Sequence, residues 1–308
     1  MNNGTIGRNL DVLTKPGACS RSVIQPEKWH GPGTAQSVYE DLATVYHLMF
    51  PDWKDLVQRQ AGTIAKIIKR KIGSHCALRI LDPTCGIGTQ ALGLAERGHI
   101  VTGCDISGAA VDRARREASE RNLDIRLEVA DVRQLTAVQE DDFDVAVSFG
   151  NSLCTLSSFP ELVLALTQIR MKLRAGGLIV AGIRDYSVAV HERPVRVDEL
   201  MLCFDDGKWR IVHQVWHWIN ATHYIAHVYI NREGESHQYS VLCRAVLRGE
   251  LTKALWAAGF VNINWLPKDP TNRRPGVYES GFDQLIVVGE RPAACCRPVP
   301  HGENRQES

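Results

Sequence analysis

Three carboxylates, each at the end of a short apolar run, could together bind a cationic ligand. They are Asp82, Asp105 and Asp131. Between the first two lies a glycine-rich turn containing Gly86 and Gly88. A glycine turn that follows a strand and opens a helix lets backbone N–H groups approach a ligand closely. The spacing therefore predicts a nucleotide site at this turn, with carboxylates along its rim.

The position of Asp82 indicates which nucleotide binds there. The turn alone permits a dinucleotide, since Ala91 occupies the place of the third glycine of a dinucleotide fingerprint. A carboxylate at Asp82 would repel a pyrophosphate but attract an ammonium or a sulfonium. Asp105 can accept hydrogen bonds from both ribose hydroxyls, and Asp131, with Val132 beside it, is positioned for an adenine amino group. The implied ligand has adenosine and a positive charge but no phosphate, which describes S-adenosylmethionine.

The elements that must position these residues alternate along the chain. The apolar runs span 78–81, 100–106, 125–131, 143–151 and 175–183. Helical patterns separate most of them, from Gln90, around 108–121 and around 159–173. This alternation predicts right-handed crossovers and an α/β, doubly wound, Rossmann-like parallel sheet with both faces covered. Open sheets of this kind bind ligands at the carboxyl ends of their strands, where the three carboxylates would meet.

The remaining segments predict a cover and a lid. Apolar spacing over 35–72 predicts two helices divided by "FPDW" at 50–53. After Arg184, four strand-like runs separated by turn-forming residues predict an antiparallel insertion before a last helix and two last strands. The predicted organisation is a mobile arm 1–35, a helical cover 36–75, a cofactor-binding core 76–186, an antiparallel lid 187–246, the C-terminal end of the core 247–290 and a disordered tail 291–308.

Composition narrows the class of partner. The 308 residues carry 36 basic and 35 acidic side chains, so no basic surplus exists to hold a phosphate backbone, and nucleic acid is not expected. No apolar run is long enough to span a bilayer and the N-terminal residues lack the apolar core of a signal peptide, so no membrane and a cytoplasmic location are expected. The nine cysteines show no spacing suited to zinc, and no metal is expected.

The segments "LDPTCGIGTQ", "VTGCDIS", "VADVRQL" and "FDVAVSFGNSLCTL" together resemble the class I S-adenosylmethionine-dependent methyltransferases, from about Tyr39 to Glu290. "FGNSLCTL" and "GIRDYSVAV" are similar to segments of the glycine and glycine/sarcosine N-methyltransferase group. That group has G-N-S-x-x-H-L after the fourth strand and R-N-Y after the fifth. This chain has Thr155 in place of the histidine and Asp185 in place of the asparagine.

The resemblance implies roles for several side chains and a seven-stranded methyltransferase sheet. Asn151 would direct its carbonyl at the substrate amine or the transferring methyl group. Arg184 would hold a substrate carboxylate. Tyr39 would help to close the site over the sulfonium, and Arg59 would pair with the methionine carboxylate of the cofactor. The remaining cofactor-binding candidates lie in the matching segments: Cys85, Gln90, Ile106 and Phe149.

Further candidates for contact with the acceptor are Tyr186, His213, Arg244 and Trp53. His213 belongs to an alternating strand in which the histidines take one face and the tryptophans the other. Two interpretations remain: histidines on the wet face of a half-exposed sheet, or a lid that brings His213 or Arg244 to the acceptor. Arg244 is equally a candidate for a core ion pair, and Trp53 for a packing residue where a helix begins.

The predicted function is methyl transfer from S-adenosylmethionine to a small-molecule acceptor, with an amine nitrogen favoured because a neutral amine needs no strong base. The alternatives are O- or C-methylation with a histidine base, a nicotinamide-dependent oxidoreductase, and a non-catalytic nucleoside-binding module. Asp82 argues against the nicotinamide enzyme. The oligomeric state stays open, a homo-oligomer being one alternative.

Overall fold

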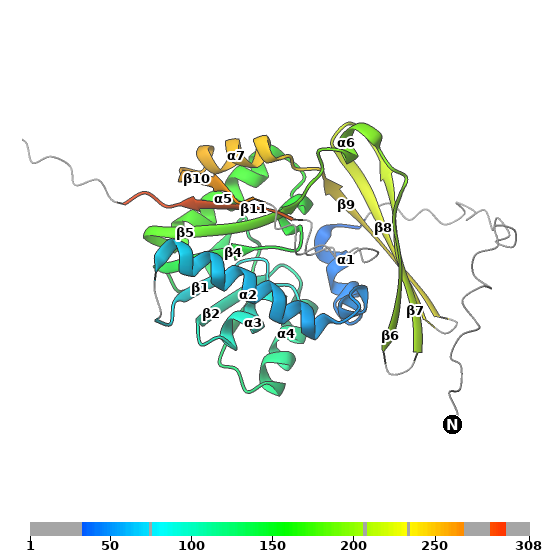
Figure 1. Ribbon diagram of the computed structural model, residues 1–308, viewed down its shortest axis with the longest axis horizontal. Coiled ribbons are helices and arrows are strands. Elements are labelled where there is room, and N and C mark those ends of the chain that lie inside the picture. The colour runs from blue at the N-terminus through cyan, green and yellow to red at the C-terminus, as the bar shows by residue number, and fades with distance from the viewer. Residues whose placement is uncertain (1–32, 74–75, 206–207, 233–234, 268–283, 294–308) are drawn as a thin grey trace, which may run out of the picture. The chain divides into compact units, whose positions relative to one another are not determined.

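The computed structural model describes residues 33–73, 76–205, 208–232, 235–267 and 284–293 (Figure 1). The chain divides into two units, Met1–Gly31 and Pro32–Ser308, and the first lies outside the described residues. Most of the predicted N-terminal arm and the predicted tail from residue 294 also lie outside them. Among the described residues, no helix is both long and apolar enough to cross a membrane.

A seven-stranded sheet forms the centre of the second unit. Its strands are β1 (Arg79–Asp82), β2 (Ile100–Asp105), β3 (Arg126–Val129), β4 (Phe143–Ser148), β5 (Leu173–Arg184), β10 (Val261–Trp265) and β11 (Gln284–Glu290). They lie in the order β10-β11-β5-β4-β1-β2-β3, and β11 is antiparallel to both of its neighbours. The other four pairings in this sheet are parallel. The predicted doubly wound sheet is confirmed, with one antiparallel strand near its edge.

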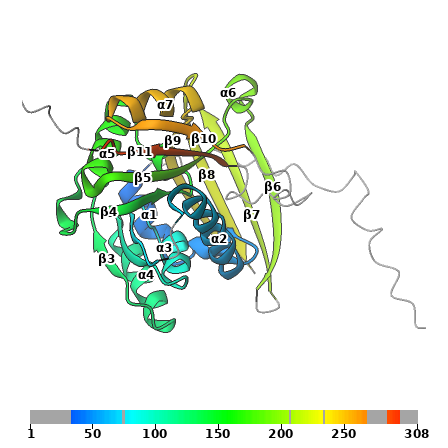
Figure 2. The same ribbon diagram turned by 60° about the vertical axis from the view of Figure 1, so that its left-hand side comes forward.

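Helices cover both faces of this sheet because its strands are apolar on both sides. One face packs against α2 (Trp53–Ile72), α3 (Thr89–Ala95) and α4 (Gly108–Glu120), and the other against α5 (Phe159–Lys172) and α7 (Arg248–Ala257) (Figure 2). Neighbouring residues alternate between the two cores, with Ile80 and Val145 in the first and Leu81 and Ala146 in the second. This period of two follows from the pleat of a strand.

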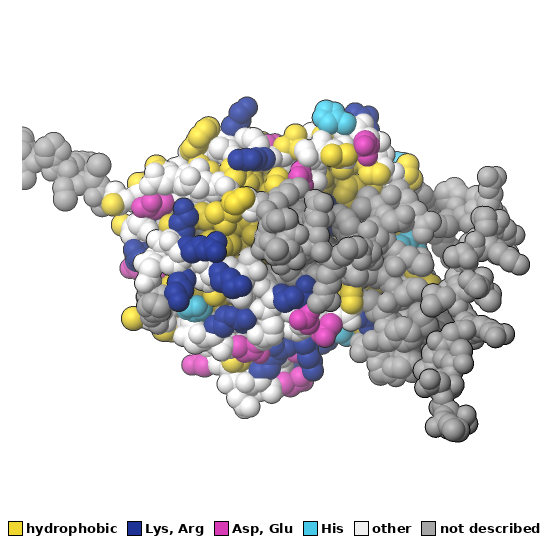
Figure 3. Space-filling model, in the orientation of Figure 1, with side chains coloured by type: hydrophobic (Ala, Val, Ile, Leu, Met, Phe, Trp, Pro, Cys, Tyr) yellow, Lys and Arg dark blue, Asp and Glu magenta, His cyan; other side chains and the backbone are white. Residues whose placement is uncertain are grey.

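Helix α2 shows why the predicted cover forms where it does. Asp52 caps its N-terminus, accepting a hydrogen bond from Asp55 N over 2.9 Å, and Gly73 ends it with a left-handed φ of 68°. The last turn carries Lys69, Arg70 and Lys71, whose charges favour the helix C-terminus. Figure 3 shows Lys and Arg side chains gathered over this helix.

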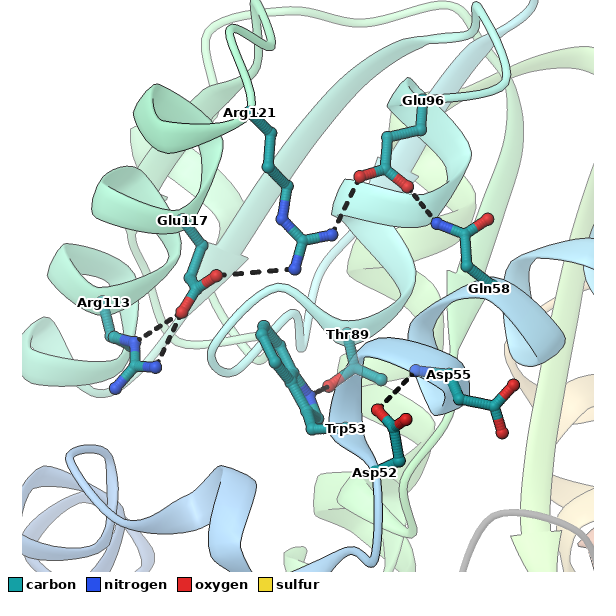
Figure 4. Close-up of polar contacts among 9 residues, drawn as sticks. All are labelled: Asp52, Trp53, Asp55, Gln58, Thr89, Glu96, Arg113, Glu117 and Arg121. Carbon is teal, nitrogen blue, oxygen red and sulfur yellow. Dashed lines mark hydrogen bonds and ion pairs between the residues drawn. The ribbon is translucent and has the colours of Figure 1, made fainter. Parts of the chain in front are cut away.

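A chain of polar contacts ties α2 to α3 and α4 (Figure 4). Arg121 pairs with Glu96 at 2.8 Å and with Glu117 at 3.4 Å, and Gln58 of α2 donates to Glu96. The Arg121 guanidinium also lies 5.5 Å from the ring centre of Trp53. Because these contacts join three helices on one face of the sheet, they fix the cover against the core.

The lid is a four-stranded antiparallel sheet in the order β6 (Arg196–Asp205), β7 (Lys208–Trp218), β8 (His223–Arg232), β9 (Glu235–Arg244). Its buried side chains Trp216 and Tyr224 belong to the same apolar cluster as β5, α5 and α7. Val228 instead packs against Leu42 of α1 (Ala35–Leu42) and Leu48 of the 3-10 turn η1 (Tyr46–Met49). The predicted inserted lid is confirmed, and it shares its core with both the main sheet and the cover.

Candidate active site

A cavity of about 510 Å³ lies where the carboxyl ends of β1, β2, β3 and β4 meet the cover. The cover contributes residues of α1, η1 and α2, and the lid contributes Leu242. Eight of the residues predicted for cofactor binding line it, and so does Tyr39, which was predicted as a catalytic residue. The eight are Cys85, Gly86, Gln90, Asp105, Ile106, Asp131, Val132 and Phe149. The sheet and its helical cover therefore bring together these residues, which are up to 110 positions apart in the sequence.

The two glycines of the turn have different roles. Gly86 lines the cavity with a left-handed φ of 53°, and a Cβ added there would meet no atom within 4 Å. The open space lies over the backbone, which is the geometry that a closely bound ligand requires. Gly88 does not line the cavity; its φ is 92°, and an added Cβ would lie 2.9 Å from Leu92. Gly88 therefore serves the turn and its packing rather than direct contact.

Asp105 holds the glycine turn while it faces the cavity. Its Oδ2 accepts the N–H of Gly86 over 2.9 Å and its Oδ1 accepts that of Ser107 over 3.0 Å. Burial raises the pKa of Asp105, the two amides oppose that shift, and the charge of Glu40 adds to it. Each oxygen keeps a lone pair beyond these bonds, so the carboxylate can still accept from a ligand hydroxyl.

Asp82 lies beneath the turn and is fully buried rather than part of the cavity wall. Its Oδ1 accepts a long hydrogen bond of 3.4 Å from Thr84 N. Its Oδ2 makes no hydrogen bond of normal geometry among the described residues, although the backbone N–H of Ala91 lies close enough to favour the ionised form. Burial outweighs both amides and raises the pKa of Asp82 to about 8. A nearby cation would favour the carboxylate.

Asp131 lines the cavity but is already paired. Its Oδ2 lies 2.6 Å from Arg133, which also pairs with Glu161 at 2.5 Å. Burial acts to raise the pKa of Asp131, but the hydrogen bonds and charge of Arg133 outweigh it and hold that pKa below its usual range. An adenine amino group would therefore share this carboxylate with Arg133. Neither Arg133 nor Glu161 was predicted for the site, because their pairing joins the turn after β3 to the first turn of α5.

These features fit the adenosine and cationic parts of S-adenosylmethionine. The open space over Gly86 accepts a ligand against the backbone, and Asp105 and Asp131 face the same cavity. Asp82 supplies a buried carboxyl whose second oxygen lacks a hydrogen bond of normal geometry. The donor set is acidic, as a ligand with a positive charge and no phosphate requires.

Two tyrosines of the cover line the cavity. Tyr39 of α1 was predicted, whereas Tyr46 was missed; it begins the separate turn η1 after α1 has ended at Leu42. Burial raises the pKa of Tyr39 well above its ordinary value and that of Tyr46 to about 12, and Asp105 adds to both shifts. Both side chains are therefore neutral phenols near neutral pH.

A further residue that sequence reasoning missed fixes the cover. Glu40 of α1 accepts the N–H groups of Gly108 and Ala109 over 2.7 and 2.8 Å. A carboxylate at a helix N-terminus pairs with otherwise unbonded amides and with the helix dipole. This cap comes from another helix, so no local pattern in the sequence marks it. It holds α1, and with it Tyr39, beside the end of β2.

The residues implied by the G-N-S and R-N-Y segments lie behind the cavity wall. The Asn151 Oδ1 accepts Arg184 N over 3.3 Å, and its Nδ2 donates to the Tyr186 hydroxyl over 2.6 Å. The Arg184 guanidinium lies 5.0 Å from the ring centre of Trp216. Asn151, Arg184 and Tyr186 are not among the cavity-lining residues, whereas Gly150, Ser152 and Thr155 are. The implied contacts with an acceptor stay predictions.

Four other candidates also lie away from the described cavity wall. The His213 ring stacks on Tyr229 at 4.7 Å, on the lid face opposite Trp216. Arg244 is buried and forms an ion pair with Glu250, which agrees with the alternative of a core ion pair. The two remaining candidates lie on α2. Arg59 pairs with Asp55 of the same helix at 2.6 Å, and Trp53 Nε1 donates to Thr89 Oγ1 of α3 over 3.0 Å.

Comparisons with known proteins agree with this geometry. Residues 80–177 match a family model described as a methyltransferase domain. The chain is 25% identical to a glycine/sarcosine N-methyltransferase of Aphanothece halophytica over 46% of its own length and 54% of that protein. It is 28% identical to a glycine N-methyltransferase of Rattus norvegicus over 47% and 52% of the two chains.

Among solved structures, a S-adenosylmethionine-dependent methyltransferase from Clostridium acetobutylicum superposes with a TM-score of 0.61 at 16% identity, covering 83% of this chain and 99% of that one. The chain spans about half the length of the curated relatives it matches. The matched domain, the strand order and the acidic rim around a glycine turn agree with one another. Residues 80–177 form a methyltransferase domain, and the fold of the chain is that of S-adenosylmethionine-dependent methyltransferases.

Proposed function

We propose that the protein transfers a methyl group from S-adenosylmethionine to an amine nitrogen of a small molecule. The observation that carries the proposal is the charge of the cavity. Among the described residues that line it, three carboxylates, Asp105, Asp131 and Glu161, stand against one cation, Arg133. An acidic cavity attracts the cationic cofactor and also concentrates a basic amine.

The chain's own residues would bind and orient the two ligands. When bound, S-adenosylmethionine supplies a methyl group whose C–S bond breaks as the nitrogen lone pair forms a C–N bond, the amine proton then passing to solvent. Asp105 would accept from ribose hydroxyls, and Asp131 would accept from the adenine amino group. Tyr39 and Tyr46 would enclose the reacting groups as neutral phenols. Enclosure and orientation supply most of what such a displacement requires.

The surroundings of His213 support nitrogen over oxygen or carbon as the acceptor atom. Methylation of an alcohol or a carbon acid needs a positioned base, whereas a neutral amine already has its lone pair. The histidine considered for that role stacks on Tyr229 on the lid face opposite Trp216. The N-methyltransferase relatives, 25% and 28% identical to this chain, support the same acceptor atom.

The experiment has a binding arm and a turnover arm. Calorimetric titration with S-adenosylhomocysteine is expected to give a measurable dissociation constant, and titration with NAD no heat. Transfer of labelled methyl is then measured for amine and alcohol pairs that share one carbon skeleton. The amine of each pair is expected to accept methyl and the alcohol not to.

Binding of NAD instead of S-adenosylhomocysteine would overturn the cofactor and the function together. Methyl transfer to the alcohols at the same rate would overturn the choice of nitrogen. Binding of S-adenosylhomocysteine without turnover on any member of the amine panel would favour the nucleoside-binding module over the enzyme.

A further inference from the structure

A buried chain of hydrogen bonds joins the lid to a loop of the cavity wall. Tyr224 lies on lid strand β8, Tyr186 follows β5, and Asn151 follows β4. The hydroxyls of Tyr224 and Tyr186 are 2.8 Å apart, and Asn151 Nδ2 donates to Tyr186 over 2.6 Å. Both tyrosines are only 1% exposed. The contact therefore runs from a lid strand, through the core, to the end of β4.

The loop that receives this contact has a left-handed backbone at two successive residues. Gly150 and Asn151 both have left-handed φ angles, of 70° and 68°. Glycine adopts this conformation freely, and asparagine adopts it when its short polar side chain finds hydrogen-bond partners nearby. Asn151 is compensated at both ends of its amide, because its Oδ1 also accepts Arg184 N over 3.3 Å. The side-chain bonds thus keep the backbone of Asn151 in its left-handed conformation.

This loop shapes the cavity although Asn151 does not line it. Gly150 precedes the turn and lines the cavity, and so do Ser152 and Thr155 of the 3-10 turn η3 (Ser152–Thr155). Thr155 Oγ1 donates back to Ser152 O over 2.7 Å, which closes η3 on itself. If Asn151 left its conformation, the wall on both sides of it would shift. The carboxylates Asp105 and Asp131 make none of these bonds.

Rearrangement of this chain of hydrogen bonds would be energetically unfavourable. A buried hydroxyl without a partner is costly, and the two phenol hydroxyls bond each other, with Asn151 Nδ2 as a second partner of Tyr186. Trp216 stacks on Tyr224 with ring centres 4.3 Å apart, and Arg184 lies over the same indole. Burial raises the pKa of Tyr186 and of Tyr224 well above the ordinary value, so both remain protonated donors across the neutral range.

We propose that Tyr224 and Tyr186 are positioning residues, which act through Asn151 to hold the Gly150–Ser152 wall in its productive shape. The inference rests on the proposed methyl transfer and adds to it a dependence of turnover on the lid. Loss of either hydroxyl shifts the wall at the end of β4 but leaves the Asp105 contacts in place. Turnover is therefore more sensitive to these hydroxyls than cofactor binding is.

The test compares Tyr224→Phe, Tyr186→Phe and the double variant with Tyr229→Phe as the matched control. Tyr229 lies on the same strand and faces the other side, stacked on His213. Acceptor kcat/KM is expected to fall about fivefold or more in each of the first two variants, the value of one net hydrogen bond. The double variant is expected to fall no further than Tyr186→Phe, because the chain is already broken. The S-adenosylhomocysteine Kd and the Tyr229→Phe variant should change less than about twofold, below the effect of one hydrogen bond.

A second readout does not depend on activity. Hydrogen exchange of the S-adenosylhomocysteine complex is measured at residues 150–156 and at the glycine turn 84–90. Tyr224→Phe is expected to speed exchange in the first segment and not in the second. If no amine accepts methyl but this pattern holds, the proposed function fails and the positioning role stands.

Several results would overturn the positioning role while methyl transfer stands. Unchanged kcat/KM in Tyr224→Phe with unchanged exchange at 150–156 is one of them. Additive losses in the double variant, or equal losses of turnover and cofactor affinity, would instead indicate independent packing effects.

Discussion

The two sheets of the chain hold their side chains near the cavity in different ways. In the seven-stranded sheet, Asp105 reaches Gly86 across 19 positions and bonds its own following turn. In the lid, Tyr224 reaches Tyr186 across 38 positions, and Tyr186 reaches Asn151 across 35 more. The first arrangement is complete within one strand–helix–strand unit, whereas the second exists only when lid and core are packed together.

This difference separates two kinds of function. The strand ends of the main sheet supply the carboxylates that we propose bind the cofactor. The lid shares an apolar core with β5 and acts on the cavity through a loop rather than by lining it extensively. Substitutions in the first region should alter cofactor binding and stability, and those on the inner lid face should alter turnover.

The largest effect is expected for the pH dependence of stability, through Asp82. Its pKa rises from about 4 in the unfolded chain to about 8 in the folded one because it is buried. The folded state then binds an extra proton between these values. The contribution of Asp82 to the free energy of unfolding is full below about pH 4 and is lost as the pH rises through about 8. The loss is up to about 1.4 kcal/mol per pH unit. Denaturant unfolding of wild type and Asp82→Asn between about pH 5 and pH 8 measures the difference.

Asp82→Asn removes the titrating group, so its free energy of unfolding should fall less over this interval than that of wild type. Asp124→Asn, at an exposed aspartate, is the control and should follow wild type. Identical slopes for wild type and Asp82→Asn would show that Asp82 is ionised throughout and has its ordinary pKa.

The next effect in size concerns cofactor affinity. Asp105→Ala removes the proposed acceptor for the ribose hydroxyls and releases the N–H of Gly86. Loss of charge-assisted hydrogen bonds of this kind weakens binding by about 1–3 kcal/mol, or about 5- to 150-fold in the Kd for S-adenosylhomocysteine. Calorimetry measures it, with Asp112→Ala, exposed on α4, as the control. An unchanged Kd would remove Asp105 from the site.

A smaller effect is expected where the cover meets the core. Glu40→Ala removes the cap on two α4 amides, which typically lowers the free energy of unfolding by about 0.5–2 kcal/mol. Because α1 also carries Tyr39, the S-adenosylhomocysteine Kd should rise as well. Asp41→Ala, the adjacent exposed carboxylate, is the control. Equal effects of the two substitutions would show that the α4 cap is not what holds α1.

A further prediction concerns the hydrogen bond by which Trp53 of the helical cover contacts Thr89 of the cavity wall. Trp53→Phe keeps an aromatic ring but loses the hydrogen bond to Thr89, a residue of the cavity wall. A coupling energy of about 0.5–1.5 kcal/mol between Trp53→Phe and Thr89→Val is expected from double-mutant unfolding. Trp256→Phe, 61% exposed on α7, controls for the loss of an indole. A coupling energy of zero would leave Trp53 as a packing residue only.

The glycine turn and the acidic strand ends of the candidate site were predictable, because their sequence signals are local. A strand, a glycine turn and an acidic residue at the next strand end lie within 30 residues, and parallel strands bring such ends to one edge. The alternation of runs likewise predicted the sheet, its covering helices and the inserted lid. Gly88 shows the limit even here, since spacing does not distinguish a glycine that faces a ligand from one that packs on Leu92.

The rest of the candidate site depends on side-chain contacts that no local sequence pattern indicates. Arg133 pairs with both Asp131 and Glu161, and the second of these lies 28 positions away in the first turn of α5. Asn151 and Arg184 belong to the segments that resemble the family. Yet the Asn151 side chain accepts a hydrogen bond from Arg184 N, and the Arg184 guanidinium lies over the Trp216 ring. A motif fixes residue type, whereas side-chain direction follows from packing between elements that are distant in the sequence.

The smallest effect is expected on the outer face of the lid. His213→Asn removes the ring that stacks on Tyr229 without touching the inner face, where Tyr224 and Trp216 lie. Acceptor kcat/KM should therefore stay within about twofold of wild type, whereas loss of a general base typically reduces the rate by about 10²–10⁴-fold. Steady-state methyl transfer at several pH values measures it, beside Tyr224→Phe. A loss of that size in His213→Asn would make the outer face catalytic and restore the histidine-base alternative. A small loss, beside a larger one in Tyr224→Phe, would assign the lid's influence to its inner face alone.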